Sequence, residues 1–143
     1  MYYGYLSESV APTNKEYAKI KDQHHLYNLL SDLWCEYTCA PRMRDKWSKD
    51  NKTLGQCSIT AFLVQDIFGG NVYGVKLDDG NYHCYNEVNG IVFDLTSEQF
   101  GNEKLNYSLE NLQSRESHFS KQEKYERYLF LKNELNNVLS KID

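Results

Sequence analysis

The sequence has 143 residues, of which 41% are hydrophobic, and this fits one globular domain over residues 1–143 with a sizeable core. Its net charge of -4, with no lysine or arginine cluster, argues against a nucleic-acid-binding protein. No stretch has the length of a membrane span, and residues 1–14 lack the basic start and apolar run of a secretory signal. We therefore expect a cytoplasmic protein whose four cysteines are reduced thiols.

Apolar residues recur at three- and four-residue intervals in residues 15–39, which predicts one amphipathic helix packed over the core. Four side chains of this segment are of types that can bind zinc: His24, His25, Cys35 and Cys39. Structural zinc sites more often show tighter, recurring spacings with two complete pairs. We therefore expect no metal site, and we expect no cofactor.

Residues 40–53 are expected to form a loop that leads into the next helix. Three of its basic side chains, Arg42, Arg44 and Lys46, are expected to form a solvated edge. Trp47 would either line a substrate cleft or anchor the loop through its apolar ring, since large aromatic side chains serve both uses.

Between Ile59 and Phe68 few residues are polar, too few for one solvated face, so this segment is predicted to be a buried helix. Gly69 can adopt the left-handed conformation that commonly ends a helix. Cys57 then lies in the first turn, where unpaired backbone N–H groups and the positive end of the helix dipole stabilise a thiolate. The alternative is that Cys57 is a small buried side chain without a chemical role.

Residues 72–77 are predicted to form a strand, and an Asp-Gly pair turns the chain back into a second strand at 83–88. Asn89-Gly90 is the strongest short-range signal for a two-residue type I′ turn into a third strand at 91–96. The three strands together would form an antiparallel meander.

The register of this hairpin decides which of its side chains share a face, because opposed residues do so and faces alternate along each strand. His83 and Asp94 are then diagonal neighbours, about 7 to 8 Å apart at the backbone, and their side chains can meet. Cys84 points to the opposite, largely apolar face, so Cys57 is the expected partner of His83. The first face comprises His83, Tyr85, Glu87, Val92, Asp94 and Thr96, and the second Cys84, Asn86, Val88, Ile91, Phe93 and Leu95.

Thr96 or Ser97 is expected to cap a short helix that follows the hairpin. Residues 120–142 are predicted to form a long terminal helix. The expected buried stripe of this helix comprises Tyr125, Tyr128, Leu129, Leu131, Leu135, Val138, Leu139 and Ile142. The elements together predict an α+β fold, in which a small antiparallel sheet packs on the central helix that begins near Cys57 and flanking helices close the outside.

The sequence resembles two families. Gly55-Gln56-Cys57 before a helix, His83-x-Tyr85-Asn86-Glu87, and a strand ending Asp94-x-Thr96 are similar to the Cys-His-Asp core of the transglutaminase-like cysteine enzymes. A closer resemblance, over most of the chain, is to the bacterial YunG-like proteins. It rests on Trp47, Gly55-Gln56-Cys57, Val64-Gln65-Asp66, Gly69-Gly70, His83-x-Tyr85-Asn86, Gly90, Asp94-Leu95-Thr96 and Gln99-Phe100.

The first resemblance implies a papain-like, transglutaminase-like core, with two departures. Ser58 follows the cysteine where transglutaminases often have an aromatic residue, which puts an aromatic contact to the oxyanion in doubt. The hairpin between His83 and Asp94 is short and leaves less wall around a substrate cleft.

We expect thiol acyl chemistry on a protein, a peptide or a small amide. In this hypothesis Cys57 attacks a carboxamide or ester carbonyl, His83 transfers the proton and Asp94 orients His83. The reaction would be that of a hydrolase, a deamidase, an acyltransferase or a transglutaminase. Further candidate contacts, for the oxyanion or the substrate, are the Cys57 amide, Gln56, Trp47, Tyr85 and Asn86.

Two other interpretations stay open. A binding or regulatory protein could keep this core without turnover, which the short chain and short hairpin favour. Alternatively, the three residues are structural, so that Cys57 packs, His83 forms a hydrogen bond and Asp94 caps the helix after the hairpin. The sequence sets no oligomeric state.

Overall fold

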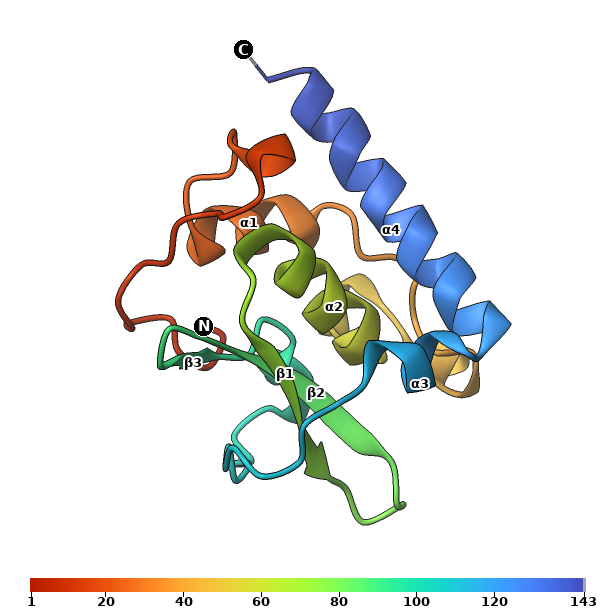
Figure 1. Cartoon of the computed structure of the whole chain (residues 1–143). Helices are drawn as coiled ribbons and strands as arrows, with labels where there is room; N and C mark the ends of the chain where they lie inside the picture. The colour runs from red at the N-terminus through yellow and green to blue at the C-terminus, as the bar shows by residue number, and fades with distance from the viewer. Residues whose placement is uncertain (143) are drawn as a thin grey trace.

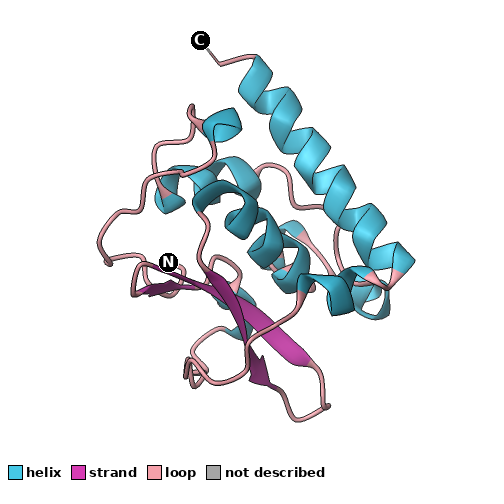
Figure 2. Cartoon of the chain, viewed as in Figure 1, coloured by secondary structure: helices cyan, strands magenta, loops and turns pink. Residues whose placement is uncertain are grey.

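The computed structural model describes residues 1–142 and has an α+β fold. The strands form one antiparallel sheet in the order β1-β2-β3, and the α-helices gather on one side of it (Figures 1 and 2). The main elements are α1 (Gln23–Ser31), α2 (Cys57–Phe68), β1 (Asn71–Lys76), β2 (Tyr82–Val88), β3 (Ile91–Phe93), α3 (Arg115–Phe119) and α4 (Gln122–Ser140). Short 3-10 helices occupy Lys15–Tyr17, Pro41–Lys46, Lys49–Asn51 and Ser97–Phe100. The predicted α+β class and the three-stranded antiparallel meander are confirmed.

Helix α2 is the central element, with the sheet on one side and α4 on the other (Figure 1). It is apolar nearly all round, and Phe62, Leu63 and Ile67 are fully buried. The helix begins at Cys57 and ends before Gly69, which has a φ of 80°. The predicted buried helix with a first-turn cysteine is therefore confirmed.

The β2–β3 hairpin has the predicted turn and register. Asn89 and Gly90 have φ values of 53° and 84°, as a type I′ turn requires, and Val88 pairs with Ile91. The third strand is shorter than predicted and ends at Phe93, and the backbone N–H of the next residue, Asp94, donates to the Tyr3 carbonyl at 3.0 Å on the outer edge of the hairpin. The end of β2 that carries the site histidine thus has no β3 partner.

The single helix predicted over residues 15–39 is wrong. The Asp22 side chain accepts a hydrogen bond from the backbone N–H of His25 at 2.8 Å, so α1 begins there and nine residues later it has ended. After α1, the Thr38 hydroxyl accepts from the Cys35 N–H at 2.9 Å. Such local side-chain bonds offer the backbone an alternative to helix, which explains why the periodicity misleads here.

Helix α4 confirms the predicted terminal helix, but its buried side chains differ from the prediction. Tyr125 and Leu129 are exposed. Arg127 is buried instead, because its guanidinium donates to Glu123 at 2.8 Å and to the Thr38 carbonyl at 2.8 Å. Among residues 1–142, no helix has the length and apolarity that crossing a membrane requires.

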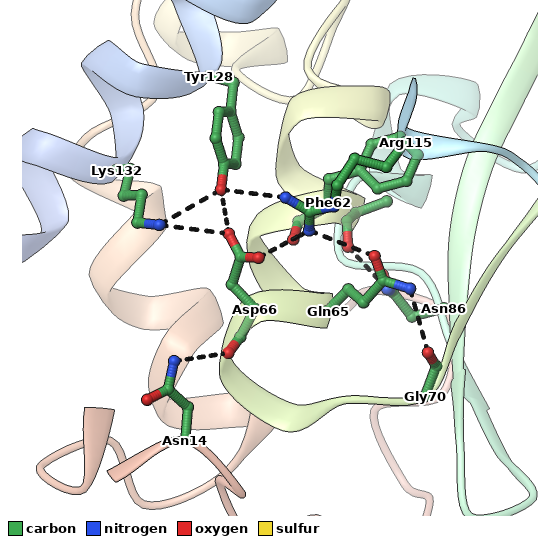
Figure 3. A network of polar contacts seen from close by, with 10 residues as sticks. Asn14, Phe62, Gln65, Asp66, Gly70, Asn86, Arg115, Tyr128 and Lys132 are labelled. Atoms are coloured by element: carbon green, nitrogen blue, oxygen red, sulfur yellow. Dashed lines mark hydrogen bonds and ion pairs between the residues drawn. The ribbon is translucent and has the colours of Figure 1, made fainter. Parts of the chain in front are cut away.

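A polar network joins the C-terminal end of α2 to α3 and α4 (Figure 3). The Asp66 carboxylate accepts from Arg115 at 2.7 Å and from the Tyr128 hydroxyl, and Lys132 lies 3.6 Å away. The Asp66 backbone carbonyl accepts from the Asn14 side chain at 3.0 Å. These contacts fix the position of α2, and hence of Cys57 at its other end.

Candidate functional site

Cys57 is brought to the mouth of a cavity by the glycine that precedes α2. Gly55 has a φ of 71°, and a Cβ there would lie 2.5 Å from the Cys39 sulfur and 2.8 Å from the Ala40 nitrogen. Only glycine allows the start of α2 to approach residues 39–40 so closely. Cys57 is half-buried and, with His83, lines a cavity of about 680 Å³.

His83 and Asp94 meet as the hairpin register predicts. The His83 Nε2 atom lies 2.6 Å from Asp94 Oδ2, and each side chain is 1% exposed. The Tyr107 hydroxyl donates to the same oxygen at 2.8 Å, while the Thr96 backbone N–H donates to Oδ1 at 3.1 Å. The Asp94 carboxylate is thus held from three sides, and it fixes the imidazole.

The contacts of Asp94 also correct the predicted helix cap. The Thr96 hydroxyl donates to Asp94 Oδ1 at 3.3 Å, and the 3-10 helix that starts at Ser97 has no side-chain cap. Ser97 instead accepts from the Tyr3 backbone N–H through its hydroxyl at 2.7 Å. Both candidate caps are therefore used to hold Asp94 and the N-terminal segment in place.

Cys57 and His83 change each other's protonation. Burial disfavours a charged imidazole, but the charge and hydrogen bond of Asp94, together with Cys57, outweigh burial and raise the pKa of His83 to about 10. The pKa of Cys57 is lowered well below its ordinary value, first by a hydrogen bond with the Cys84 side chain and then by the hydrogen bond and charge of His83, against the opposing effect of burial. Because Nε2 faces Asp94, Nδ1 is the nitrogen left for Cys57. The arrangement favours a thiolate beside an imidazolium.

The contact between Cys57 and Cys84 is not predicted by the hairpin register, which places Cys84 on the face opposite His83. Cys84 does lie in the core, but β3 ends at Phe93 and leaves the edge of β2 open there. Hydrogen bonding with the side chain and the backbone of Cys84 helps to lower the pKa of Cys57. The hydrogen bond with Cys57, together with burial, raises the pKa of Cys84. Cys84 therefore stays a thiol that can donate to a Cys57 thiolate.

Two predicted site residues on the segment before α2 lie away from the cavity lining. Gln56 is fully buried, and its Nε2 donates to the Cys35 carbonyl at 3.2 Å. The Trp47 indole donates to the Lys52 carbonyl at 3.0 Å, so Trp47 anchors its own loop.

Two predicted site residues on β2 also lie away from the cavity lining. Tyr85 is buried, and its hydroxyl donates to the Ser108 carbonyl. The Asn86 side chain donates to the Ala61 carbonyl at 2.9 Å, which ties the sheet to α2. Both residues support the site through the backbone that they hold.

The cavity is also lined by residues that sequence reasoning missed. Lys124 donates to Nδ1 of His118 at 2.9 Å, and Nε2 of His118 lies 2.8 Å from Gln113 Oε1, so this ring is a neutral imidazole that accepts at one nitrogen and donates at the other. Burial and the charge of Lys124 lower the pKa of His118 to about 4, which agrees with that assignment. Lys121 and Lys124 lie at the positive end of α4, where a cation is unfavourable for the helix, and this signal could have identified them.

Other side chains singled out in the sequence differ in their relation to this cavity. Arg42, predicted on a solvated edge, lines the cavity and pairs with Asp79 at 3.5 Å. His24 packs against the rings of Tyr2 and Tyr5, away from the cysteines named with it as zinc-binding types. In the part of the chain that the structure describes, no three His, Cys, Asp or Glu side chains are arranged to hold a metal ion.

Comparison with known proteins gives one family. The model of the family described as YunG protein matches residues 22–140, which include Cys57, His83 and Asp94. The protein called Uncharacterized protein YunG of Bacillus subtilis (strain 168) is 37% identical over 76 residues. That alignment covers 53% of this chain and 61% of the relative, so the chain spans less than two thirds of the relative's length. No solved structure matches the chain.

Proposed function

The chain belongs to the YunG protein family, and we propose that it is a cysteine-dependent acyl-transfer enzyme acting on an amide or ester of a protein, a peptide or a small molecule. The observation that carries the proposal is the arrangement around Cys57. A half-buried thiol at a helix N-terminus contacts a histidine that is fixed by a buried carboxylate, and thiol and histidine line one cavity. Such a nucleophile, base and orienting group are the parts that covalent acyl transfer needs.

In the first half of the proposed reaction, the Cys57 thiolate attacks the carbonyl carbon and the carbonyl electrons move to oxygen. The free amides at the start of α2, including that of Cys57, can donate to this oxyanion. When the intermediate collapses, the C–N or C–O bond breaks and the leaving amine or alcohol takes the proton from the His83 imidazolium. The product is a thioester on Cys57.

In the second half, water or another nucleophile gives its proton to neutral His83 and attacks the thioester. The C–S bond breaks, the acyl group leaves, and Cys57 returns as a thiolate beside imidazolium. Asp94 accepts from Nε2 throughout and keeps Nδ1 directed at the sulfur and the reacting groups. Water as acceptor gives a hydrolase or deamidase, and an amine gives a transglutaminase.

We also propose that the centre of the fold corresponds to a transglutaminase-like, papain-like core. The order of Cys57, His83 and Asp94 along the chain, and their positions at a helix start, on a strand and after the next strand, support this. The four free cysteines support a reducing compartment such as the cytoplasm, where a catalytic thiol would persist.

The test is alkylation by iodoacetamide at pH 6 followed by mass mapping of all four cysteines. An ordinary thiol with a pKa of about 8.5 is only about 0.3% ionised at pH 6. We expect Cys57 to react first, and His83→Gln, which keeps a donor for Asp94, to slow Cys57 on the order of 100-fold at pH 6 and only a few-fold at pH 9. The matched control is His25→Ala, a histidine outside the cavity.

Equal alkylation of all accessible cysteines at pH 6, with no effect of His83→Gln, would overturn the proposal and favour the binding protein that lacks turnover. If His83→Gln does not fold, the pH dependence of the wild-type rate decides instead. A midpoint near 8.5 for Cys57 would contradict an activated thiolate.

A further inference from the structure

We propose that the Cys57 cavity selects an acyl substrate that carries a carboxylate, bound by Lys121 and Lys124 in the lining of the same cavity. This inference rests on the proposed function, since it names the substrate class of the same site. It means that the natural substrate would be an acidic amide or ester rather than a neutral one.

The charges that line the cavity are opposite to the charge of the chain. Four cationic side chains, Arg42, Lys121, Lys124 and Arg127, face one carboxylate, Glu123, which gives the lining a formal charge of three positive units. The chain as a whole has a net charge of -4. A thiolate at Cys57 and an imidazolium at His83 cancel each other and leave this excess unchanged. A cavity lined by one sign of charge concentrates ligands of the other sign.

Two of the four cations already have carboxylate partners. Arg127 is bonded to Glu123 at 2.8 Å, and Arg42 is paired with Asp79 at 3.5 Å. Neither Lys121 nor Lys124 forms an ion pair with any carboxylate of residues 1–142. The two lysines are therefore the cations available to a ligand.

Lys124 is held in place by neutral groups. Its Nζ donates to His118, which in turn is bonded to Gln113 on the segment before α3. Because His118 is uncharged, it orients the ammonium group without neutralising it. Burial lowers the pKa of Lys124, which shows that its charge has lost part of its hydration. A ligand carboxylate would supply the missing partner in surroundings where an ion pair is stronger than in bulk water.

The experiment uses two alkylating probes of similar size, iodoacetate and iodoacetamide, which differ in charge. The rates at Cys57 are measured at pH 8 and low salt, and their ratio is normalised to that of the same cysteine in the urea-unfolded chain. Because both probes react with the same thiolate, the ratio of their rates does not depend on the fraction of Cys57 that is ionised. We expect the folded protein to favour iodoacetate by about fivefold or more, and added salt to reduce the preference.

The double variant Lys121→Gln with Lys124→Gln should remove this preference. Lys141→Gln, an equal charge change at the far end of α4, should leave it intact. A normalised ratio near one in the wild type, or a preference that survives the double variant, would overturn the inference. This result is separate from the fate of the proposed function, because even an unactivated thiol reacts at pH 8, whereas activation is judged from iodoacetamide at pH 6 and from His83→Gln.

Discussion

Each end of α2 carries an ionisable side chain that is at least partly buried, Asp66 at the C-terminal end and Cys57 at the N-terminal end. The two side chains differ in their bonding partners. At the C-terminal end, the Asp66 carboxylate is surrounded by Arg115, Tyr128 and Lys132, and these three partners satisfy both of its oxygens (Figure 3). At the N-terminal end, Cys57 lies half-buried at the edge of β2 and borders a cavity of about 680 Å³.

This difference separates a structural polar cluster from a chemical one. A carboxylate held by an arginine, a lysine and a tyrosine hydroxyl stabilises the packing of three helices. A thiolate supported by His83 and Cys84 that also lines a cavity can meet a substrate there. The residue type therefore matters less than the number of partners that the fold supplies.

The largest expected effect comes from Asp94→Asn, because Asp94 holds His83, the histidine next to Cys57 at the N-terminal end of α2. An amide nitrogen next to His83 Nε2 and the Tyr107 hydroxyl cannot accept from either, so the imidazole loses its charge and its orientation. We expect iodoacetamide labelling of Cys57 at pH 6 to fall on the order of 100-fold. The remaining oxygen can still accept from Thr96, so the protein should still fold, but His83 and Tyr107 lose a charged acceptor and the thermal unfolding midpoint should fall by several degrees. A large loss of stability with unchanged labelling would show that Asp94 serves only to hold the turn.

The matched substitution at the C-terminal end of α2, Asp66→Asn, should lower stability and leave the labelling of Cys57 nearly unchanged. It removes a charged acceptor from Arg115 and Lys132, and hydrogen bonds to charged groups contribute about 2 kcal/mol. The thermal unfolding midpoint should therefore fall by about 4 to 8 °C, as measured by circular dichroism. Labelling of Cys57 at pH 6, below the transition, should stay within about twofold of the wild-type rate. A large change in labelling would mean that the two ends of α2 are coupled.

The smallest expected effect is the contribution of His83 and Cys57 to the pH dependence of the free energy of unfolding. The raised pKa of His83 gives stability that is fully present below about 6.5 and is lost as the pH rises towards the folded-state pKa of about 10. The lowered pKa of Cys57 gives stability that is present above about 8.5 and is lost as the pH falls. The two changes cancel between about pH 6.5 and 8.5, because folding then only moves one proton from sulfur to imidazole.

The test compares, by urea unfolding, the wild type with the double variant Cys57→Ser and His83→Gln. The difference between their free energies of unfolding should stay constant between about pH 6.5 and 8.5. Above about pH 8.5 the wild-type advantage should fall by about 1.4 kcal/mol per pH unit. A wild-type advantage that keeps rising with pH above 8.5 would contradict the thiolate and imidazolium pair.

The sequence by itself determined the features that neighbouring residues control. The apolar run before Gly69 predicts α2, the Asn89-Gly90 turn sets the register of the hairpin, and that register brings His83 to Asp94. Each depends on backbone conformation within a few residues, so periodicity and turn chemistry suffice. The prediction fails over residues 15–39, where local side-chain bonds interrupt a periodic pattern.

Only the tertiary structure decided what surrounds these residues. Tyr3 pairs with Asp94 across the outer edge of the hairpin, and β3 ends at Phe93, so the part of β2 that carries His83 and Cys84 has no β3 partner. The packing of α4 against α2, and of α3 against α4, brings Lys124 and His118 to the lining of the cavity. These contacts join segments far apart in the chain, and no local pattern encodes them, because each depends on how whole elements pack together.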